Sequence, residues 1–527
     1  MTTTTWFDAR RRPSRWVPLS VCAGLGLVVA LMQWRGSDFP AQLFRIDQIR
    51  AHGFVLWNSQ WYGGHPTLEY SVLTPLLGAL IGPVALGLIA GLVATAVFDR
   101  ITRDAATTRL ASAWFAAATV INLVVGRIAF AVGLALALVA VRGLQQNRRV
   151  VALASALLTS LASPVAGAFL AIVAIAWALA RGKPKGMALG VIALTAAPIV
   201  VVRLAFPVEG QFPFTVASLV FDLAISAAIF WLARDQESPV VRWSALLYGA
   251  ACVFFFVVPT ALGGNISRLA QLLGGPIALL LAWPQRHVLL ARWRIVLVGL
   301  ALPLLAWQWL PTIDGIAYAG RDPSTTRTYY QPLVAFLTAH GVAPGRVEIP
   351  FTARHWETAF VAESVPLARG WERQLDMAYN PSFYDHTLDA KGYGDWLVDN
   401  AVSYVALPDA PLDESSFGEH ALLNTDLPYL QAVWSNPHWK VWKVTSYHGL
   451  VDGPGIVAAT TTSGFIIESA GGDVVVHIRY SPHWSIKGPG CVAPGESSSW
   501  IHLVGLAPGR TVVEQALRGT LCPPVTA

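Results

Sequence analysis

Residues 17–33, VPLSVCAGLGLVVALMQ, form the first apolar stretch of the chain, and the next one begins at residue 72. The loop between them, Trp34–Tyr70, reads WRGSDFPAQLFRIDQIRAHGFVLWNSQWYGGHPTLEY. A helix needs about 20 apolar residues to cross a bilayer whose hydrocarbon is about 30 Å thick. The sequence therefore predicts a membrane helix followed by a 37-residue polar and aromatic loop at one membrane surface.

The composition predicts a polytopic membrane protein. Of the 527 residues, 54% are hydrophobic and only 13% are charged, whereas soluble domains are about 25% charged. We expect about eleven transmembrane helices, near residues 17–33, 72–98, 108–124, 128–143, 149–163, 165–180, 187–206, 215–233, 243–262, 269–283 and 295–311. The predicted domains are therefore a transmembrane domain at 1–312, an α/β domain at 313–453 and a β-rich domain at 454–527.

Basic residues orient the predicted helices, because cytoplasmic loops collect Lys and Arg. With eleven spans, most basic loop residues fall on the N-terminal side of the membrane. The other side has only six, namely Arg35, Arg45, Arg50, Arg127, Arg203 and Arg268. We expect a multi-pass plasma-membrane protein with a cytoplasmic N-terminus, an uncleaved signal anchor as the first span, and the long loop and C-terminal domains outside the cytoplasm.

Several function classes lack their motifs here. The chain has no GxxxxGK[ST], no HExxH and no GxSxG in a strand-turn-helix context, which argues against an ATP-driven pump or a membrane zinc protease. The net charge of +6 is explained by the inner loops, so nucleic acid is not an expected partner. Cys491 and Cys522 fall in the outer domain, where oxidation is allowed, and a structural disulfide between them is predicted.

The long loop contains the main candidate residues. Asp38 follows the first span by five positions, where its carboxylate can face a cavity at the membrane surface; a solvated loop acid is the alternative. Trp57, Trp61 and Tyr62 are either interfacial anchors or a stacking platform for a sugar or an isoprenoid. His65 and Glu69, which follow the Gly63-Gly64 pair, are candidates for contacting an acceptor or a metal ion.

Three arginines, Arg127, Arg203 and Arg268, lie at the outer ends of apolar spans. A guanidinium group suits bidentate phosphate binding, and a polyprenyl-phosphate donor presents a phosphate at this surface. Snorkelling or ion pairing is the alternative. Arg268 is the preferred phosphate ligand of the three.

The C-terminal part contains alternating strand and helix patterns. Predicted strands are 346–350, 402–408 and 439–444, with helices at 328–340 and 388–400, which indicates an α/β layer. Short strands at 464–469, 473–480 and 500–505 indicate a small β-sandwich. The segment Arg369–Asp376 places polar groups beside an aromatic residue, so Trp371 and Arg373 are candidates for an acceptor-facing surface.

The early Asp38, the basic helical stretch after it and the segment W-x-x-x-W-Y-G-G-H-P (57–66) together resemble the GT-C superfamily of integral membrane glycosyltransferases. More narrowly, the chain resembles bacterial, actinobacterial-type membrane proteins labelled as related to 6-pyruvoyl-tetrahydropterin synthase, although no residue pattern indicates pterin chemistry. The resemblance covers the architecture of the whole membrane domain, while its motifs are confined to the first loop.

The resemblance implies an inverting transfer of a sugar from a polyprenyl-phosphate donor to a cell-envelope glycan or lipid acceptor. Asp38 would be the general base, and Arg268 would hold the departing phosphate. Arabinose and mannose are the sugars that the actinobacterial resemblance implies. Some relatives have paired acids at the Asp38 position and use a divalent cation, whereas this chain has Ser37-Asp38, so a divalent cation stays an open expectation and no other cofactor is implied.

Two other functions compete with this interpretation. A lipid or glycolipid transporter or flippase would use the outer arginines and the intramembrane Asp222 along a translocation path, although the internal repeats typical of transporters are not found. A catalytically silent envelope assembly factor would keep the fold with a decayed site.

Overall fold

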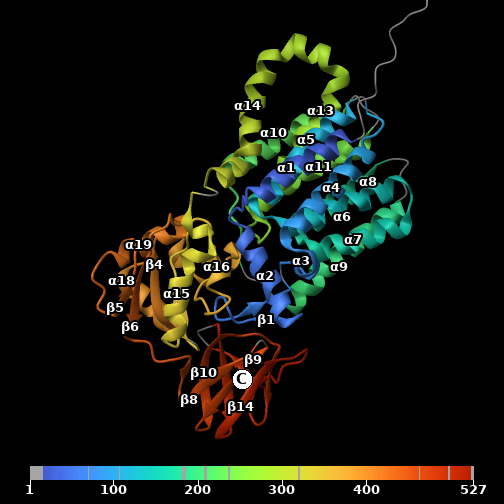
Figure 1. Ribbon diagram of the computed structural model, residues 1–527. Helices are drawn as coiled ribbons and strands as arrows, with labels where there is room; N and C mark the ends of the chain where they lie inside the picture. Colours follow the sequence, from blue (N-terminus) through green and yellow to red (C-terminus); the bar gives the residue numbers. More distant parts are fainter. Residues whose placement is uncertain are drawn as a thin grey trace, which may run out of the picture.

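The computed structural model describes residues 16–523, apart from 69, 106, 181–184, 207–209, 235–237, 319–320, 343, 462 and 496–498. Figure 1 shows three parts, which are a helical bundle, an α/β domain beside its lower end and a β-sandwich below both. Helix α2 of the first loop lies where these parts meet.

The bundle is built from helices that follow the apolar stretches of the sequence. They are α1 (Val17–Leu31), α2 (Phe39–His52), α3 (Leu73–Ile81), α4 (Pro83–Ile101), α5 (Thr108–Val125), α6 (Ile128–Gln145), α7 (Arg149–Ala162), α8 (Pro164–Leu179), α9 (Lys185–Ala205), α10 (Val216–Leu232), α11 (Pro239–Val257), α12 (Ser267–Leu269), α13 (Gly275–Ala282) and α14 (Arg286–Tyr318). Short turns flank α12 and α13, namely η1 (Gly263–Ile266), η2 (Ala270–Gly274) and η3 (Trp283–Gln285).

Among the described residues, six helical stretches have the length and hydropathy needed to cross a membrane, and four apolar helices are shorter. These helices indicate an integral membrane protein. The expected span 72–98 is divided into α3 and α4, because Gly82 has a φ of +83° and Pro83 begins the second helix. The expected span 295–311 lies within α14, which contains Pro303 and Pro311 and arches away from the bundle in Figure 1; the side chains of residues 290–300 are outside the described part.

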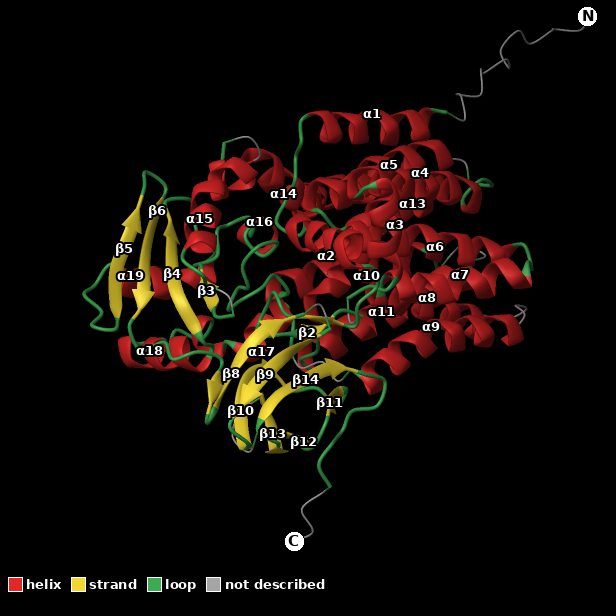
Figure 2. Cartoon of the chain, turned by 60° about the horizontal axis from the view of Figure 1, so that its bottom comes forward, coloured by secondary structure: helices red, strands yellow, loops and turns green. Residues whose placement is uncertain are grey.

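The α/β domain packs helices α15 (Arg327–Ala339), α16 (Glu357–Phe360), α17 (Arg373–Tyr379), α18 (Ala390–Asp399) and α19 (Phe417–Leu423) around a four-stranded sheet. The sheet order is β3-β4-β6-β5, with β3 (Arg346–Glu348), β4 (Val402–Pro408), β5 (Leu430–Ser435) and β6 (Trp439–Val444). Only β3 and β4 are parallel. Figure 2 shows this sheet well separated from the strands of the sandwich.

The sandwich has two antiparallel sheets that share one apolar core. One sheet has the order β12-β13-β10-β7, with β7 (Val451–Asp452), β10 (Gly472–Arg479), β12 (Cys491–Pro494) and β13 (Trp500–Leu506). The other has the order β11-β14-β9-β8, with β8 (Gly455–Thr460), β9 (Gly464–Ser469), β11 (Trp484–Lys487) and β14 (Gly509–Gln515). A disulfide joins Cys491 and Cys522.

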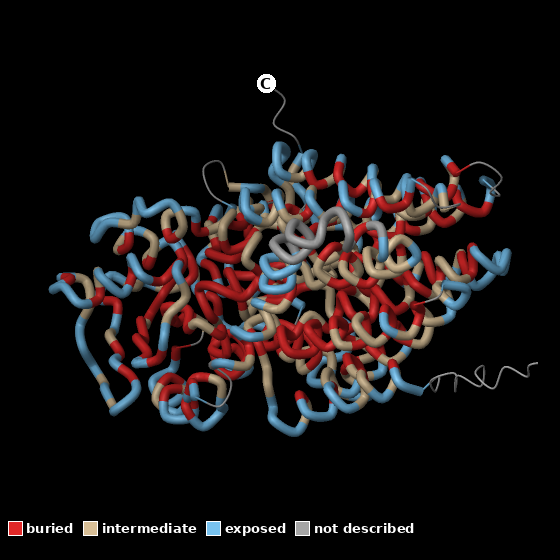
Figure 3. Tube along the Cα trace, turned by 90° about the horizontal axis from the view of Figure 1, so that it is seen from above, coloured by how far each residue is buried: buried red, intermediate tan, exposed pale blue. Residues whose placement is uncertain are grey.

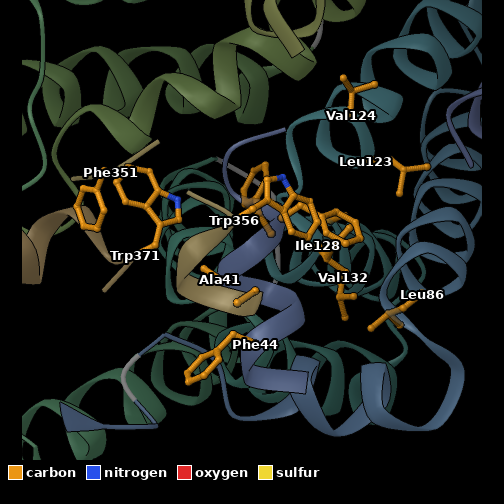
Figure 4. Packing of buried hydrophobic residues seen from close by; sticks show 14 of the residues in the cluster. Ala41, Phe44, Leu86, Leu123, Val124, Ile128, Val132, Phe351, Trp356 and Trp371 are labelled. Carbon is orange, nitrogen blue, oxygen red and sulfur yellow. The ribbon is translucent and has the colours of Figure 1, made fainter. Parts of the chain in front are cut away.

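The first loop contacts the bundle, the α/β domain and the sandwich. Besides α2 it contains a two-residue hairpin of β1 (Trp57–Asn58) and β2 (His65–Pro66). One apolar cluster runs from the bundle through α2 into the α/β domain. Trp356 packs beside α2 and near Ile128 of α6 (Figure 4), and buried residues continue from the bundle into the α/β domain (Figure 3). The bundle and the α/β domain therefore share one core.

The start of the loop is pinned to the end of α5. The amides of Gly36 and Asp38 donate hydrogen bonds to the carbonyl oxygens of Val124 and Val125, at 2.7 and 3.1 Å. The next residue, Gly126, has a φ of +95°, and a Cβ atom there would lie 2.3 Å from the amide nitrogen of Phe39. Only glycine fits this crossing, because any side chain would push the loop away.

We therefore expect Gly126→Ala to destabilise the protein. The left-handed backbone alone costs a residue with a side chain about 1–3 kcal/mol, and the overlap with Phe39 adds to that cost. The midpoint of thermal unfolding in detergent, followed by tryptophan fluorescence, measures the effect. The matched control is Gly24→Ala in α1, where a Cβ atom meets nothing within 4 Å; equal midpoints for the two variants would contradict this account.

The core of the α/β domain contains an acid whose charged form is disfavoured. Glu357 is fully buried, and its Oε2 accepts hydrogen bonds from Thr352 at 2.6 Å and Tyr330 at 3.4 Å. Its Oε1 has no hydrogen-bond partner among the described residues. Burial raises the pKa of Glu357 from the ordinary 4.5 to about 8. The native state therefore holds a proton that the unfolded state releases.

This difference makes stability depend on pH. Between pH 4.5 and about 8 the native state binds more protons than the unfolded state, so Glu357 lowers the free energy of unfolding as the pH rises through that window. We expect Glu357→Gln to reduce this decline, because the amide has no charge to bury. Thermal unfolding at several pH values between 5 and 8 tests it, with the exposed Glu468→Gln as a control whose slope matches wild type. An unchanged slope in Glu357→Gln would disprove the effect.

Candidate functional site

A cavity of about 640 Å³ lies where the bundle, the first loop and the α/β domain meet. Its polar wall combines side chains from all three parts, which are Ser37, Asp38, Arg45, Tyr70, Arg203, Asn265, Arg268, Arg354, His355, Trp371, Arg373 and Asp413. Its apolar wall comes from the ends of α7, α8 and α9, with Leu161, Pro164, Val165, Pro198, Ile199 and Val202. The cavity can therefore hold a ligand with one charged end and one apolar end.

Asp38 sits between two of the predicted arginines. Its Oδ2 lies 3.4 Å from Nε of Arg127 and 3.9 Å from a terminal nitrogen of Arg268. The carboxylate side chain is 26% exposed, and the two arginine side chains are 18% and 11% exposed. One carboxylate does not neutralise two guanidinium groups, so the group keeps a net positive charge that suits an anion. Arg203 lines the same cavity from α9.

A buried polar network positions Arg268. The hydroxyl of Ser267 donates to Asp222 at 2.6 Å, and the hydroxyl of Tyr248 contacts both Asp222 at 2.9 Å and the carbonyl oxygen of Ile266 at 3.2 Å. Asp222 is fully buried in α10. Two hydroxyl groups thus hydrogen-bond to the Asp222 carboxylate. These bonds hold the two residues that precede Arg268, and a short π-helix, η2, begins two residues after it.

Each described carboxylate of the cavity is paired with an arginine. Besides Asp38, the pairs are Glu372 with Arg45 at 2.6 Å, Asp314 with Arg354 at 3.1 Å and Asp413 with Arg373 at 2.7 Å. The pair of Arg45 and Glu372 is buried and joins α2 to the α/β domain. Removing one partner of such a pair leaves an uncompensated charge and costs about 3–5 kcal/mol.

The α/β domain contributes an aromatic face to the cavity. The rings of His355 and Trp371 stack almost in parallel, with an angle of 13° between them. His355 has a φ of +58° and lies 3.5 Å from Asp413 through Nε2. Burial lowers the pKa of His355 below the ordinary 6.5, so the ring is neutral at pH 7. Trp371 and Arg373, predicted from the sequence, both line the cavity.

The aromatic residues of the first loop do not line the cavity. Trp61 and Tyr62 are fully buried, and Trp57 and His65 are each 3% exposed. Trp61 stacks between Phe44 and His65. A side chain without accessible surface cannot stack on a sugar, which corrects the predicted role of these four residues in contacting substrate or a metal ion. Glu69 lies outside the described residues.

These buried residues instead connect the three parts of the molecule. The indole of Trp61 donates to the carbonyl oxygen of Thr358 at 3.0 Å, and the hydroxyl of Tyr62 donates to that of Gly370 at 2.5 Å. Trp57 packs edge-on against Trp484 in the sandwich, with ring centroids 5.1 Å apart. The motif therefore serves packing between domains.

Several charged residues of the cavity were not predicted as site residues, among them Arg45, Asp314, Arg354, His355, Glu372 and Asp413. Arg354 and His355 lie in the segment after β3, six and seven residues beyond its end, and segments after parallel strands often contribute to sites in α/β sheets. That position was the available signal. Nothing in the local sequence of Arg45 or Glu372 indicates that they pair across more than 300 residues.

Neither a protein-family model nor a curated protein matches this chain. Among solved structures, the chain is similar to the crystal structure of ArnT from Cupriavidus metallidurans in the apo state. The match covers 81% of this chain and 98% of that chain, at 14% sequence identity and a TM-score of 0.44.

Proposed function

We propose that this integral membrane protein is a glycosyltransferase that moves a sugar from a polyprenyl-phosphate donor to a cell-envelope glycan or lipid, with inversion at the sugar. One observation carries the proposal. Asp38 lies within 4 Å of two arginines at a cavity that apolar side chains of α7, α8 and α9 also line. A base, a phosphate-binding group and a lipid-binding surface are the parts that this reaction requires.

The donor fits the two walls of the cavity. Arg268 and Arg127 would hold its phosphate through charge-assisted hydrogen bonds, with Arg203 as a further contact. The isoprenoid would lie along Leu161, Val165 and Ile199 toward the bilayer. Burial of the apolar chain would contribute about 25 cal/mol for each Å² removed from water.

In the transfer step, an acceptor hydroxyl oxygen attacks the anomeric carbon and forms the new C–O bond. The bond from that carbon to the phosphate oxygen breaks, and its electron pair leaves with the polyprenyl phosphate. Asp38 takes the hydroxyl proton, and Arg268 and Arg127 stabilise the charge on the departing phosphate. Attack from the face opposite the phosphate inverts the anomeric configuration.

The acceptor would enter from the α/β domain. Trp371 offers an aromatic surface for a sugar ring, while Arg373 and His355 offer polar contacts at the same wall. We propose an orientation with a cytoplasmic N-terminus, in which the cavity and both C-terminal domains lie outside the cytoplasm. A disulfide such as that of Cys491 and Cys522 is stable there.

The described residues do not fit a divalent cation at Asp38. Two guanidinium groups lie within 4 Å of Asp38, the one carboxylate that the described residues place there, and their charge repels a metal cation. The other described carboxylates of the cavity are paired with arginines of their own. We therefore propose a transfer step without a metal ion.

The first test is transfer of radiolabelled sugar from synthetic polyprenyl-phosphate donors to envelope glycan acceptors by the purified protein. We expect Asp38→Asn to lose about 10²- to 10⁴-fold in rate, because the amide cannot take the proton. Asp47→Asn is the matched control, since Asp47 lies on α2, the helix that begins directly after Asp38, and pairs with Arg50 outside the cavity.

Three outcomes would contradict either the proposed function or the role of Asp38 as general base. Undiminished transfer by a folded Asp38→Asn variant would remove Asp38 from the chemistry. No transfer across the donor panel, with lipid-linked donor bound, would favour the transporter. No binding and no transfer would favour the silent assembly factor.

A second prediction concerns the phosphate. We expect Arg268→Gln to lower transfer by about 10²- to 10³-fold, because a donor to the departing charge is lost, and to weaken donor binding measured by the intrinsic fluorescence of the protein. Arg50→Gln is the matched control, since Arg50 is on the same side of the membrane but bonds to Asp47 and the end of α3. An equal effect of both variants would point to general surface charge rather than a phosphate site.

A further inference from the structure

A group of three potential metal ligands lies at the junction between the α/β domain and the sandwich, far from the cavity in sequence and outside its lining. His448 is in the segment that joins β6 to β7, Asp452 ends β7, and His477 is on β10. Their ligand atoms all lie within 4.8 Å of one another. His477 is buried, whereas the side chains of His448 and Asp452 are 48% and 49% exposed.

The hydrogen-bond pattern of the two histidines is unusual. Nε2 of His448 lies 2.9 Å from one oxygen of Asp452, and Nε2 of His477 lies 2.8 Å from the other. Nδ1 of His477 faces the carbonyl oxygen of Asp399, and Nδ1 of His448 lies 3.3 Å from that of Ser446. All four ring nitrogens thus face acceptors.

The two Nε2 atoms and the carboxylate of Asp452 surround a position that a single cation can share. A neutral imidazole has one N–H group, so a ring whose Nδ1–H faces a carbonyl oxygen offers the lone pair of its Nε2 to a cation. Two imidazolium groups on one carboxylate would repel each other at this distance. A single metal ion at the two Nε2 atoms and Asp452 removes that repulsion and keeps both Nδ1–H groups bonded to carbonyl oxygens.

We propose that His448, Asp452 and His477 bind a zinc ion. Two imidazole nitrogens and one carboxylate oxygen are typical zinc ligands, and a tetrahedral ion with bonds of about 2 Å places its ligand atoms about 3.3 Å apart. The exposed side of the group leaves room for water as the fourth ligand. The half-exposed His448 and Asp452 can adjust by the small shifts that entry of the ion requires.

The surroundings of His477 match those of a metal ligand. A zinc-bound histidine commonly donates its other N–H to a carbonyl oxygen, which fixes the tautomer and the ring orientation. Here that carbonyl belongs to Asp399, the last residue of α18. Trp500 packs against the His477 ring and donates through its indole nitrogen to the Asp399 carboxylate at 2.8 Å.

The location gives the ion a structural role. It would tie the connecting segment to the sandwich through His448 and tie the sandwich to the α/β domain through His477 and Asp399. Zinc would therefore fix the angle between the two C-terminal domains. This role is independent of the chemistry proposed for the cavity.

The test uses full-length protein in detergent, purified without a histidine tag and dialysed against a chelator. Isothermal titration with zinc chloride should show one tight site in wild type, and zinc should raise the midpoint of thermal unfolding because it binds only the native state. His448→Ala, in the exposed connecting segment, should weaken zinc binding by about 100-fold. Cobalt bound in place of zinc should show the visible absorption of a tetrahedral site, and His448→Ala should lose it.

The matched control is His438→Ala. His438 pairs with Asp409 at 2.9 Å with nearly the same exposure, but it belongs to no group of three ligands among the described residues. Wild-type affinity in His438→Ala together with loss in His448→Ala supports the site. Absence of a tight site in wild type, or equal affinity in wild type and His448→Ala, overturns it.

Discussion

The amides of Gly36 and Asp38 bond to the carbonyl oxygens that end α5, and the candidate site depends on this contact. This contact places Asp38 beside Arg127, the residue after Gly126, and no long side chain is needed to set the distance between them. Backbone bonds define such a position better than a flexible loop does, because they involve no side-chain rotamers. The absence of a side chain at Gly126 makes the crossing possible.

Charge in the site is arranged so that an anion completes it. Among the described residues, the cavity and a smaller one beside it, which Arg127 and Arg268 line, have six arginines, Arg45, Arg127, Arg203, Arg268, Arg354 and Arg373, and four carboxylates, Asp38, Asp314, Glu372 and Asp413. Three of the described carboxylates each pair with one arginine, whereas Asp38 faces both Arg127 and Arg268, which leaves an excess of positive charge in this described group. In a cavity with an apolar wall, such an excess attracts a phosphate more strongly than it would in open water.

Much of the fold could be predicted from sequence because it follows short-range patterns. The strands β4, β6 and β9 have the predicted limits, and α18 lies within its predicted range. The break at Gly82 was missed, because hydropathy over a window does not register one residue with a positive φ. Asp38, Arg268, Trp371 and Arg373 were found by residue type and position at the expected surface, and all four line the cavity.

The loop aromatics show the limit of that reasoning. Trp61 and Tyr62 have the composition of a substrate platform, and only the distant Thr358 and Gly370 make them core residues. Arg45 and Glu372 were missed for the same reason. A pair separated by 327 residues leaves no local signal.

The loop hairpin also constrains the order in which the protein can be assembled. The guanidinium of Arg479 donates to the carbonyl oxygen of Tyr62, 417 positions earlier in the chain. At about 5–20 residues per second, synthesis takes roughly 20 to 80 seconds to reach that partner. During this time the membrane helices can insert, but the loop lacks the surfaces that bury Trp57, Trp61 and Tyr62. The first loop therefore reaches its final packing only after the sandwich, which supplies Arg479 and Trp484, has folded.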